Sequence, residues 1–230
     1  MTEGQSAAPE RSFERLLQER YSCRAFLPRQ VDTATITRIL EIAQRTPSWC
    51  NSQPWKVAIT RGAATDRFRD TIYAYAASHE REPDFPFPRE YRGVYLERRR
   101  ECGFQLYKSV GIERGDKEGA ARQGMENYRL FGAPHVLIVT TEEALGVYGV
   151  LDCGAWVNNF MLAARSLGVA SIAQAALGAH PKFLRAHFGL PEDRRVVCGI
   201  SFGYEDAAHP VNRFRTSRAK LDDVVSWVDA

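Results

Sequence analysis

Apolar side chains recur along this chain in two patterns, one typical of helices and the other typical of strands. Within residues 12–20, Phe13, Leu16 and Leu17 fall on one face of a helix. Over residues 55–60, apolar and polar positions alternate, which is typical of a half-buried strand. The helical spacing predicts further helices over residues 33–46, 65–81, 95–110, 116–131, 150–167 and 181–188. Apolar runs rich in β-branched residues predict further strands over residues 135–141, 169–173 and 196–203.

This alternation of helices and strands predicts an α+β fold, an α/β sandwich in which long helices flank a small mixed or antiparallel sheet. The length suits a single domain over residues 1–230. Three parts are expected to lie outside the core. They are a flexible polar tail at 1–11, a helical excursion at 82–132 that opens with a proline-rich aromatic loop, and an extended C-terminal arm at 209–230 with a last short segment at 221–228.

Composition and charge then narrow the functional classes. A net charge of +3 is too small for a nucleic-acid-binding protein, which needs a strongly basic face. The five cysteines contain no Cys-x-x-Cys pair and the histidines show no metal-ligand spacing, so we expect reduced thiols and no metal site. The first residues lack the apolar segment of a signal peptide and no apolar run is long enough to span a membrane, so a cytoplasmic protein without membrane contact is predicted.

Two polar blocks carry the chemistry. The first, Arg20-Tyr21-Ser22-Cys23-Arg24, puts two guanidinium groups and a hydroxyl into five positions, and the second runs from Pro47 to Trp55 just before a predicted strand. Arginines suit a phosphate, whereas the amides of Asn51 and Gln53 suit the polar edge of a heteroaromatic ring. Together the blocks predict a site for flavin mononucleotide (FMN), although each arginine taken alone is more often a solvated surface charge.

These blocks, with Leu167-Gly168-Val169-Ala170-Ser171 after the apolar helix at 150–167, resemble the nitroreductase family over nearly the whole chain. The resemblance implies a nitroreductase-like fold and an intertwined homodimer with shared active sites. It also implies bound FMN, with NADH or NADPH as a transient co-substrate. The apolar helix is expected to be buried in the core or at the subunit interface, because it has so little polar surface.

The resemblance implies roles for residues that match the family motifs. Residues 20–24 would hold the phosphate and pyrimidine edge, 47–51 would reach the flavin bound mainly by the other subunit, and 175–178 would lie over the N5 side of the ring. The cofactor-binding residues expected in all are Arg20, Tyr21, Ser22, Arg24, Pro47, Ser48, Trp49, Asn51, Gln53, Ala175, Ala176, Leu177, Gly178, Arg215 and Arg218, with Arg213 as an alternative to one of the last two. Typical members carry a Glu-Gly pair in the 175–178 loop, and its absence here favours the subgroup that acts on nitroaromatic acids and related arenes.

The excursion at 82–132 would cover the substrate channel in such a protein. Aromatic side chains in it offer flat faces to a flat substrate, although aromatics at helical spacing are more often core residues. The expected substrate-binding residues are Phe85, Tyr91, Tyr95, Phe104 and Tyr107. The run Arg98-Arg99-Arg100 suits an anionic substrate or the NADP phosphate, or else a solvated face.

The sequence therefore predicts an FMN-dependent NAD(P)H reductase that converts nitro groups to nitroso and hydroxylamine in a ping-pong cycle. No catalytic protein residue is expected, because the flavin N5 carries the hydride chemistry. Alternatives on the same scaffold are a quinone or enone reductase, a reductive dehalogenase and a flavin-consuming benzimidazole synthase. Alternatives of other classes are a non-catalytic flavin-binding protein and a structural dimerisation module.

Overall fold

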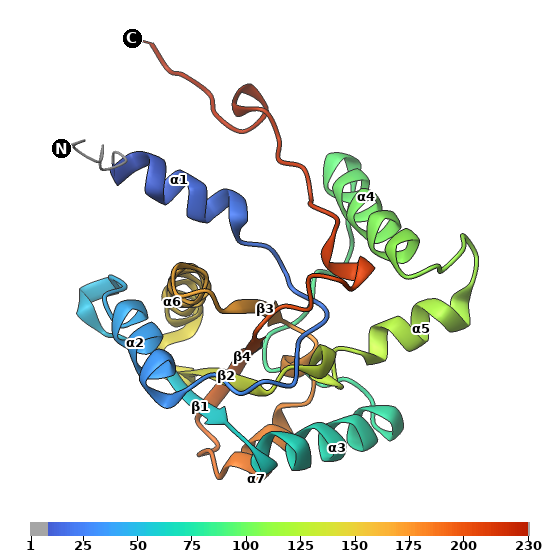
Figure 1. Ribbon diagram of the computed structural model, residues 1–230. Coiled ribbons are helices and arrows are strands. Elements are labelled where there is room, and N and C mark those ends of the chain that lie inside the picture. The colour runs from blue at the N-terminus through green and yellow to red at the C-terminus, as the bar shows by residue number, and fades with distance from the viewer. Residues whose placement is uncertain (1–8, 230) are drawn as a thin grey trace, which may run out of the picture.

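A four-stranded sheet forms the centre of the molecule in the computed structural model, which describes residues 9–229 (Figure 1). The strands are β1 (Lys56–Thr60), β2 (His135–Glu142), β3 (Ala170–Gln174) and β4 (Arg194–Gly203), in the order β1-β2-β4-β3 with every pair antiparallel. All four predicted strands are present. The small antiparallel sheet flanked by helices confirms the predicted α+β class.

The central strands β2 and β4 are nearly continuous apolar runs in the sequence, because helices cover both faces of the sheet. Along β2, Leu137 and Val139 point into one core cluster, whereas Val136 and Ile138 point into the other, as the two-residue period of a strand requires. Helices α2 (Thr33–Ala43) and α6 (Gly146–Ser166) cover the first face. Helices α3 (Ala63–Ser78) and α7 (Pro181–Phe188) cover the second.

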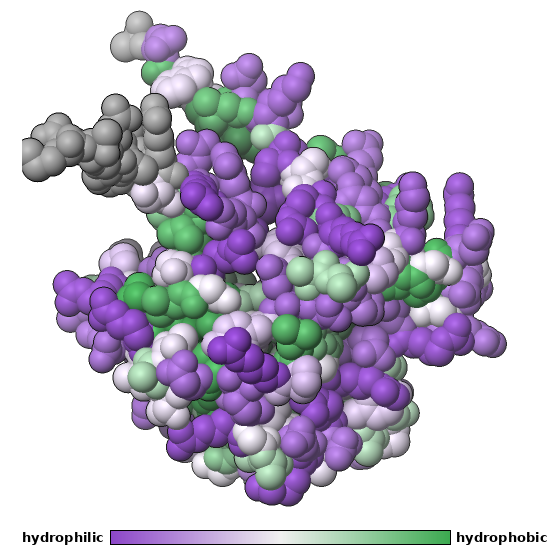
Figure 2. Space-filling model, in the orientation of Figure 1, coloured by the Kyte–Doolittle hydropathy of each residue, from purple (hydrophilic) through white to green (hydrophobic). Residues whose placement is uncertain are grey.

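Three further helices lie outside these two layers: α1 (Pro9–Glu19), α4 (Gly93–Ser109) and α5 (Lys117–Met125). Helix α4 has no fully buried residue, and α4 and α5 lie to one side of the sheet in Figure 1. After β4 the chain crosses beneath α4 and then leaves the body of the molecule. Figure 2 shows apolar side chains on this projecting C-terminal arm.

Some predicted boundaries were wrong. Helix α1 begins at Pro9, so three residues expected in the flexible tail are helical, and residues 1–8 lie outside the described part of the chain. Helix α5 ends at Met125, and it could not have continued to residue 131 because Leu130 and Phe131 adopt left-handed φ angles of 58° and 52° that no α-helix accommodates. In the last predicted segment only Leu221–Asp223 is helical, as one 3₁₀ turn.

The apolar helix α6 is buried on one side only. Trp156 and Phe160 are at most 1% exposed in the core, whereas Val147 and Leu151 are 75% and 66% exposed. Large apolar residues on the open side of a helix favour an interaction surface. Within residues 9–229, no helix combines the length and the apolar character needed to cross a membrane.

Candidate functional site

The first polar block and the C-terminal arm meet beside the β3 edge of the sheet. The Cys23 amide donates to the Ser171 carbonyl at 3.2 Å, which fixes the block against the start of β3. Asn212 holds the arm: its Oδ1 accepts the Arg24 N–H at 2.8 Å, and its Nδ2 donates to the Ala25 carbonyl at 2.8 Å. Segments 188 residues apart in the sequence thus lie side by side.

Between these segments lies a groove of about 750 Å³. Its lining includes Arg20 and Arg24 from the first block and Arg215 and Arg218 from the arm, with Glu14 as the one acidic residue among the described lining residues. Phe214 also lines the groove, with the Arg24 guanidinium 5.8 Å from the centre of its ring. We call this cavity the arginine groove. Its charge suits an anion.

Two arginines of this groove, Arg20 and Arg24, are partly desolvated. Burial lowers the pKa of Arg20, and the nearby Arg218 lowers it further. Burial also lowers the pKa of Arg24, whose guanidinium donates to the Ser22 carbonyl at 3.1 Å. Within the described residues, none of these three guanidiniums has a carboxylate within 4.0 Å. Cations removed from water without counter-charges favour binding of a dianion such as a phosphate.

Tyr21 positions one of the arm arginines. The Arg215 guanidinium lies 3.6 Å from the centre of the Tyr21 ring, a cation–π contact. The Tyr21 hydroxyl donates to Glu205 Oε2 at 2.5 Å, and burial together with this bond raises the pKa of the phenol. Arg213, by contrast, donates to the Ala208 carbonyl and does not line the groove. Of the three tail arginines named from the sequence, the fold brings two to the first block.

The loop that follows β3 lies at the far end of the same strand. Leu177 is fully buried in the core, and a Cβ added at Gly178 would lie 3.2 Å from the Val197 carbonyl, so the loop packs tightly on β4. Ala175 is exposed, so this loop offers mainly backbone groups to a ligand. Because β3 has five residues, about 16 Å separates the arginine groove from the loop. This arrangement suits an elongated ligand with one anionic end.

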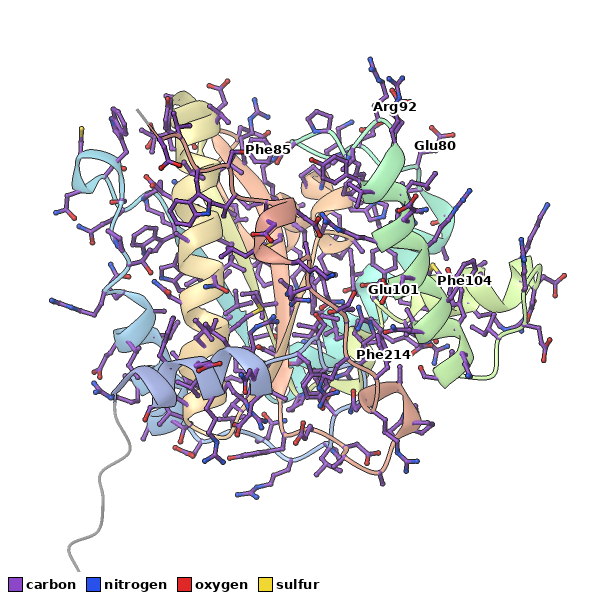
Figure 3. All side chains as sticks on the ribbon, turned by 90° about the horizontal axis from the view of Figure 1, so that it is seen from above. Glu80, Phe85, Arg92, Glu101, Phe104 and Phe214 are labelled. Carbon is purple, nitrogen blue, oxygen red and sulfur yellow. The ribbon has the colours of Figure 1, made fainter. Side chains whose placement is uncertain are left out.

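The second polar block lies elsewhere. Residues 47–53, which we call the hook, pack against the N-terminal half of α6, whereas the arginine groove lies near its C-terminal half, where Asn158 lines it. Figure 3 shows this separation: the light-blue hook lies beside one end of α6 and the blue helix α1 beside the other. Trp49 in the hook is 63% exposed. One chain therefore does not bring the two blocks together.

Local hydrogen bonds hold the hook in an unusual shape. Ser48 Oγ accepts the Gln53 N–H at 2.9 Å, and Gln53 Nε2 donates to Asn51 Oδ1 at 3.1 Å. Gln53 Oε1 accepts from Gln44 Nε2 at 3.0 Å, so its amide is engaged within the chain. Three non-glycine residues, Cys50, Asn51 and Gln53, have φ angles of 49°, 56° and 46°. Such strain is concentrated at functional sites.

The predicted substrate-binding aromatics are not gathered on one surface of the chain. Phe104 and Tyr107 line a separate cavity of about 510 Å³ between α4 and α5. Phe85 lies far from Phe104 (Figure 3), next to Asp84, which binds Arg185 Nη1 at 2.8 Å. Tyr91 packs under Arg99 at 5.1 Å. Their role stays a prediction, as does that of Tyr95, which is 67% exposed.

A family model described as the nitroreductase family matches residues 17–204. The chain belongs to the nitroreductase family. It is 36% identical over 216 residues to nitroreductase NfnB of Mycolicibacterium smegmatis, covering 93% of this chain and 92% of that protein. It is 34% identical to a 4-nitrobenzoate reductase of Nocardioides, covering 94% and 90%. These matches confirm the family resemblance found in the sequence.

Solved nitroreductases share the fold closely. The FMN-dependent NfnB of Mycobacterium smegmatis, in complex with NADPH, matches with a TM-score of 0.91 and 34% identity over 96% of this chain and 99% of that chain. The FMN- and NADPH-dependent NfnB of a Sphigopyxis strain matches with a TM-score of 0.90 and 35% identity over 95% and 99%.

Sequence reasoning missed several residues that shape the site of this nitroreductase. Asn212 joins the arm to the first block, Phe214 and Asn158 line the arginine groove, and Glu205 anchors Tyr21. No sequence pattern marks these positions, because each acts through a partner distant in the chain. Within the described residues, no cluster of three or more His, Cys, Asp or Glu side chains could hold a metal ion.

Proposed function

We propose that this protein is an FMN-dependent oxidoreductase that uses NADH or NADPH to reduce nitroaromatic compounds to nitroso and hydroxylamine products. The arginine groove carries the proposal, since its four guanidiniums converge with one acidic neighbour among the described lining residues. That donor set fits a phosphate monoester. Relatives support it, because NfnB of Mycolicibacterium smegmatis is named a nitroreductase and its solved structure is described as FMN-dependent.

In this proposal Arg20, Arg24, Arg215 and Arg218 hold the FMN phosphate, and Tyr21 keeps Arg215 in place. The loop at 175–178 presents backbone groups to the ring, where they exclude water and orient the reacting face. The chemistry that bound FMN supplies is two-electron transfer from NAD(P)H to the nitro group. No side chain of this protein is required to exchange a proton, and the Tyr21 phenol, with its raised pKa, remains protonated and bound to Glu205.

We further propose a homodimer in which each hook reaches the flavin held mainly by the other subunit. Three features support a second copy of the chain: the exposed hook, the open apolar side of α6 and the projecting arm, where Trp227 and Val228 are 77% and 93% exposed. Contiguous apolar surface of this kind marks protein interfaces. In the dimer Pro47, Ser48, Trp49 and Asn51 complete the partner's site.

The acceptors, the channel residues and the location complete the proposed function. The acceptors are nitroaromatic acids, because relatives named 4-nitrobenzoate reductases match at 34% and 30% identity and the loop after β3 lacks the Glu-Gly pair of typical members. Phe85, Tyr91 and Tyr95 line the substrate channel. The location is cytoplasmic, where NAD(P)H is produced and where the five free cysteines stay reduced.

The proposal is tested by anaerobic titration of the purified protein. We expect one FMN per chain, loss of the oxidised flavin absorbance on addition of NADH or NADPH, and its return on addition of 4-nitrobenzoate as the nitro group takes up two electrons to give the nitroso product. With excess NADH or NADPH, a second two-electron cycle should convert the nitroso product to the hydroxylamine. Protein that takes up no FMN would refute the proposal at its first step. Bound flavin that NAD(P)H does not reduce would instead favour a non-catalytic flavin-binding protein.

A further inference from the structure

One stripe of helix α6 contacts the hook at two points and Thr46, the residue just before the hook, at a third. Tyr148, Asp152 and Asn159 lie four and seven residues apart, a spacing that aligns them along one side of a helix. The Tyr148 ring packs 5.1 Å from the Trp49 ring. Asp152 Oδ2 accepts the Trp49 N–H at 3.0 Å, and Asn159 Nδ2 donates to Thr46 Oγ1 at 2.8 Å.

Asp152 differs from the other two because it carries a charge. Its side chain is 9% exposed, and it has no ion pair within the described residues. A buried carboxylate is unfavourable unless strong hydrogen bonds stabilise it, and a backbone N–H donating to a carboxylate is such a bond. The hydrogen bond that this carboxylate receives comes from Trp49, the first residue of the turn in the hook. The Asp152 carboxylate is therefore hydrogen-bonded to the backbone of the hook, at Trp49.

The hook needs such an anchor. Directly after Trp49 come Cys50 and Asn51, both with left-handed φ angles. Non-glycine residues keep that conformation only when surrounding contacts hold them in it. Without the carboxylate, the turn is free to relax toward ordinary backbone angles, which would redirect the Asn51 amide and the exposed Trp49 ring.

We infer that Asp152 is a positioning residue that fixes the hook in the shape needed to complete the flavin site of the partner subunit. The inference rests on the proposed function, since it concerns the same shared site. Asp152 does not touch the flavin itself and acts through Trp49. Its effect is therefore felt in the partner's site and not in the site of its own chain.

The first test measures FMN affinity of the dimer by flavin fluorescence for Asp152→Ala and Asp152→Asn. We expect Asp152→Ala to weaken FMN binding about 10-fold or more, the size of a lost hydrogen bond to a charged group. Asp152→Asn should restore most of it, because an amide oxygen still accepts the Trp49 N–H. If Asp152→Ala does not fold, Asp152→Ser, too short to reach Trp49, takes its place. Wild-type affinity in the truncated variant would overturn the inference.

Asp32→Ala is the matched control. Asp32 likewise accepts a backbone N–H, that of Thr35 at 2.8 Å, but it caps α2 and does not contact the hook. We expect this variant to lower the melting temperature and leave FMN affinity unchanged. An equal loss of affinity in both variants would mean that Asp152 acts only through general stability, which also overturns the inference.

The second test uses heterodimers purified with two different tags. One chain carries Asp152→Ala and the other carries Arg20→Ala with Arg24→Ala. If Asp152 acts across the interface, one site of this heterodimer combines an intact groove with an intact hook, so about half of the sites bind FMN with wild-type affinity. If Asp152 acts on its own chain's site, no site recovers, and the inference is wrong. Failure of the wild-type protein to bind FMN would refute the proposed function instead.

Discussion

The arginine groove and the hook are built in opposite ways. The groove joins residues from both ends of the chain, through Asn212 and Arg24. Its Arg20 and Arg24 are half-buried, its Arg215 and Arg218 are exposed, and none of the four has a left-handed backbone conformation. The hook is made by a few consecutive residues, is strained at three of them and leaves Trp49 63% exposed. A single chain thus completes the cationic, phosphate-binding end of the proposed site, whereas in the proposed dimer the hook serves a ligand that is held mainly by the other chain.

This difference explains why strain is found in one region and not in the other. Guanidiniums reach a common point from several directions because their side chains are long and flexible, so the backbone need not be distorted. A short turn that must direct its backbone and one amide at a ligand has fewer ways to do so. Left-handed conformations at Cys50, Asn51 and Gln53 provide that direction at a cost of about 1 kcal/mol or more each.

Substitutions in the arginine groove should cause the largest loss of FMN affinity. Replacing both Arg20 and Arg218 by alanine removes two charged partners of the phosphate, so we expect FMN affinity to fall at least about 100-fold. Flavin fluorescence measures this. Arg213→Ala is the control from the same tail, and it should leave affinity unchanged because Arg213 lies outside the groove. If Arg213→Ala and Arg218→Ala lowered FMN affinity equally, a charge anywhere in the tail would support phosphate binding. The position of Arg218 in the groove would then not matter.

Substitutions in the hook should cause a smaller loss of FMN affinity. Asn51→Ala and Asn51→Gly both remove the amide, so each should weaken FMN binding about 10-fold. They should differ in stability, because glycine adopts the φ of 56° freely whereas alanine does not. We expect denaturant unfolding to show Asn51→Gly more stable than Asn51→Ala by about 1 kcal/mol. The reverse order would contradict the strained geometry.

A change of pH should have a moderate effect on the free energy of unfolding through His135, whose ring stacks on Phe202 in the core. His135 is 1% exposed and its Nε2 accepts the Val31 N–H at 3.0 Å. Burial lowers its pKa below the ordinary 6.5. Below pH 6.5 the His135 imidazole therefore binds a proton in the unfolded chain but stays neutral in the folded chain until the pH is lower. The free energy of unfolding consequently falls as the pH drops from 7 to 5.

His135→Gln measures this contribution, because an amide can also accept the Val31 N–H. The slope of unfolding free energy against pH should become shallower by up to about 1.4 kcal/mol per pH unit over this range. Some slope will remain, since burial also lowers the pKa of His180 and of His187. An unchanged slope would show that His135 is not buried as a neutral base.

The smallest effect concerns two cysteines, one in each region. Cys23, in the first block, is fully buried, and burial raises the pKa of its thiol to about 11, so it should resist labelling at pH 8. Cys50, in the hook, is exposed and should react readily. Peptide mass spectrometry follows both. If the hook lies over the partner's flavin, FMN should slow labelling of Cys50 several-fold; an unaffected rate would argue that the hook stays in solvent.

The sequence by itself determined the elements of this fold and the chemistry of both blocks. Apolar spacing located all four strands, because periodicity depends only on neighbouring residues. Family motifs identified the nitroreductase scaffold for the same reason: they are short and contiguous. One error, the continuation of α5 to residue 131, fell where the left-handed Leu130 and Phe131 interrupt an apparently regular pattern.

Only the tertiary structure decided which distant residues meet. It selected Arg215 and Arg218 over Arg213 for the groove, revealed Asn212 as the link to Arg24, and separated Phe104 from Phe85. It also placed the hook at the opposite end of α6 from the groove. The physical reason is that such meetings depend on how whole elements pack. The sequence shows which residues carry charges and amides, but the packing of the sheet and the helices sets the distances between them.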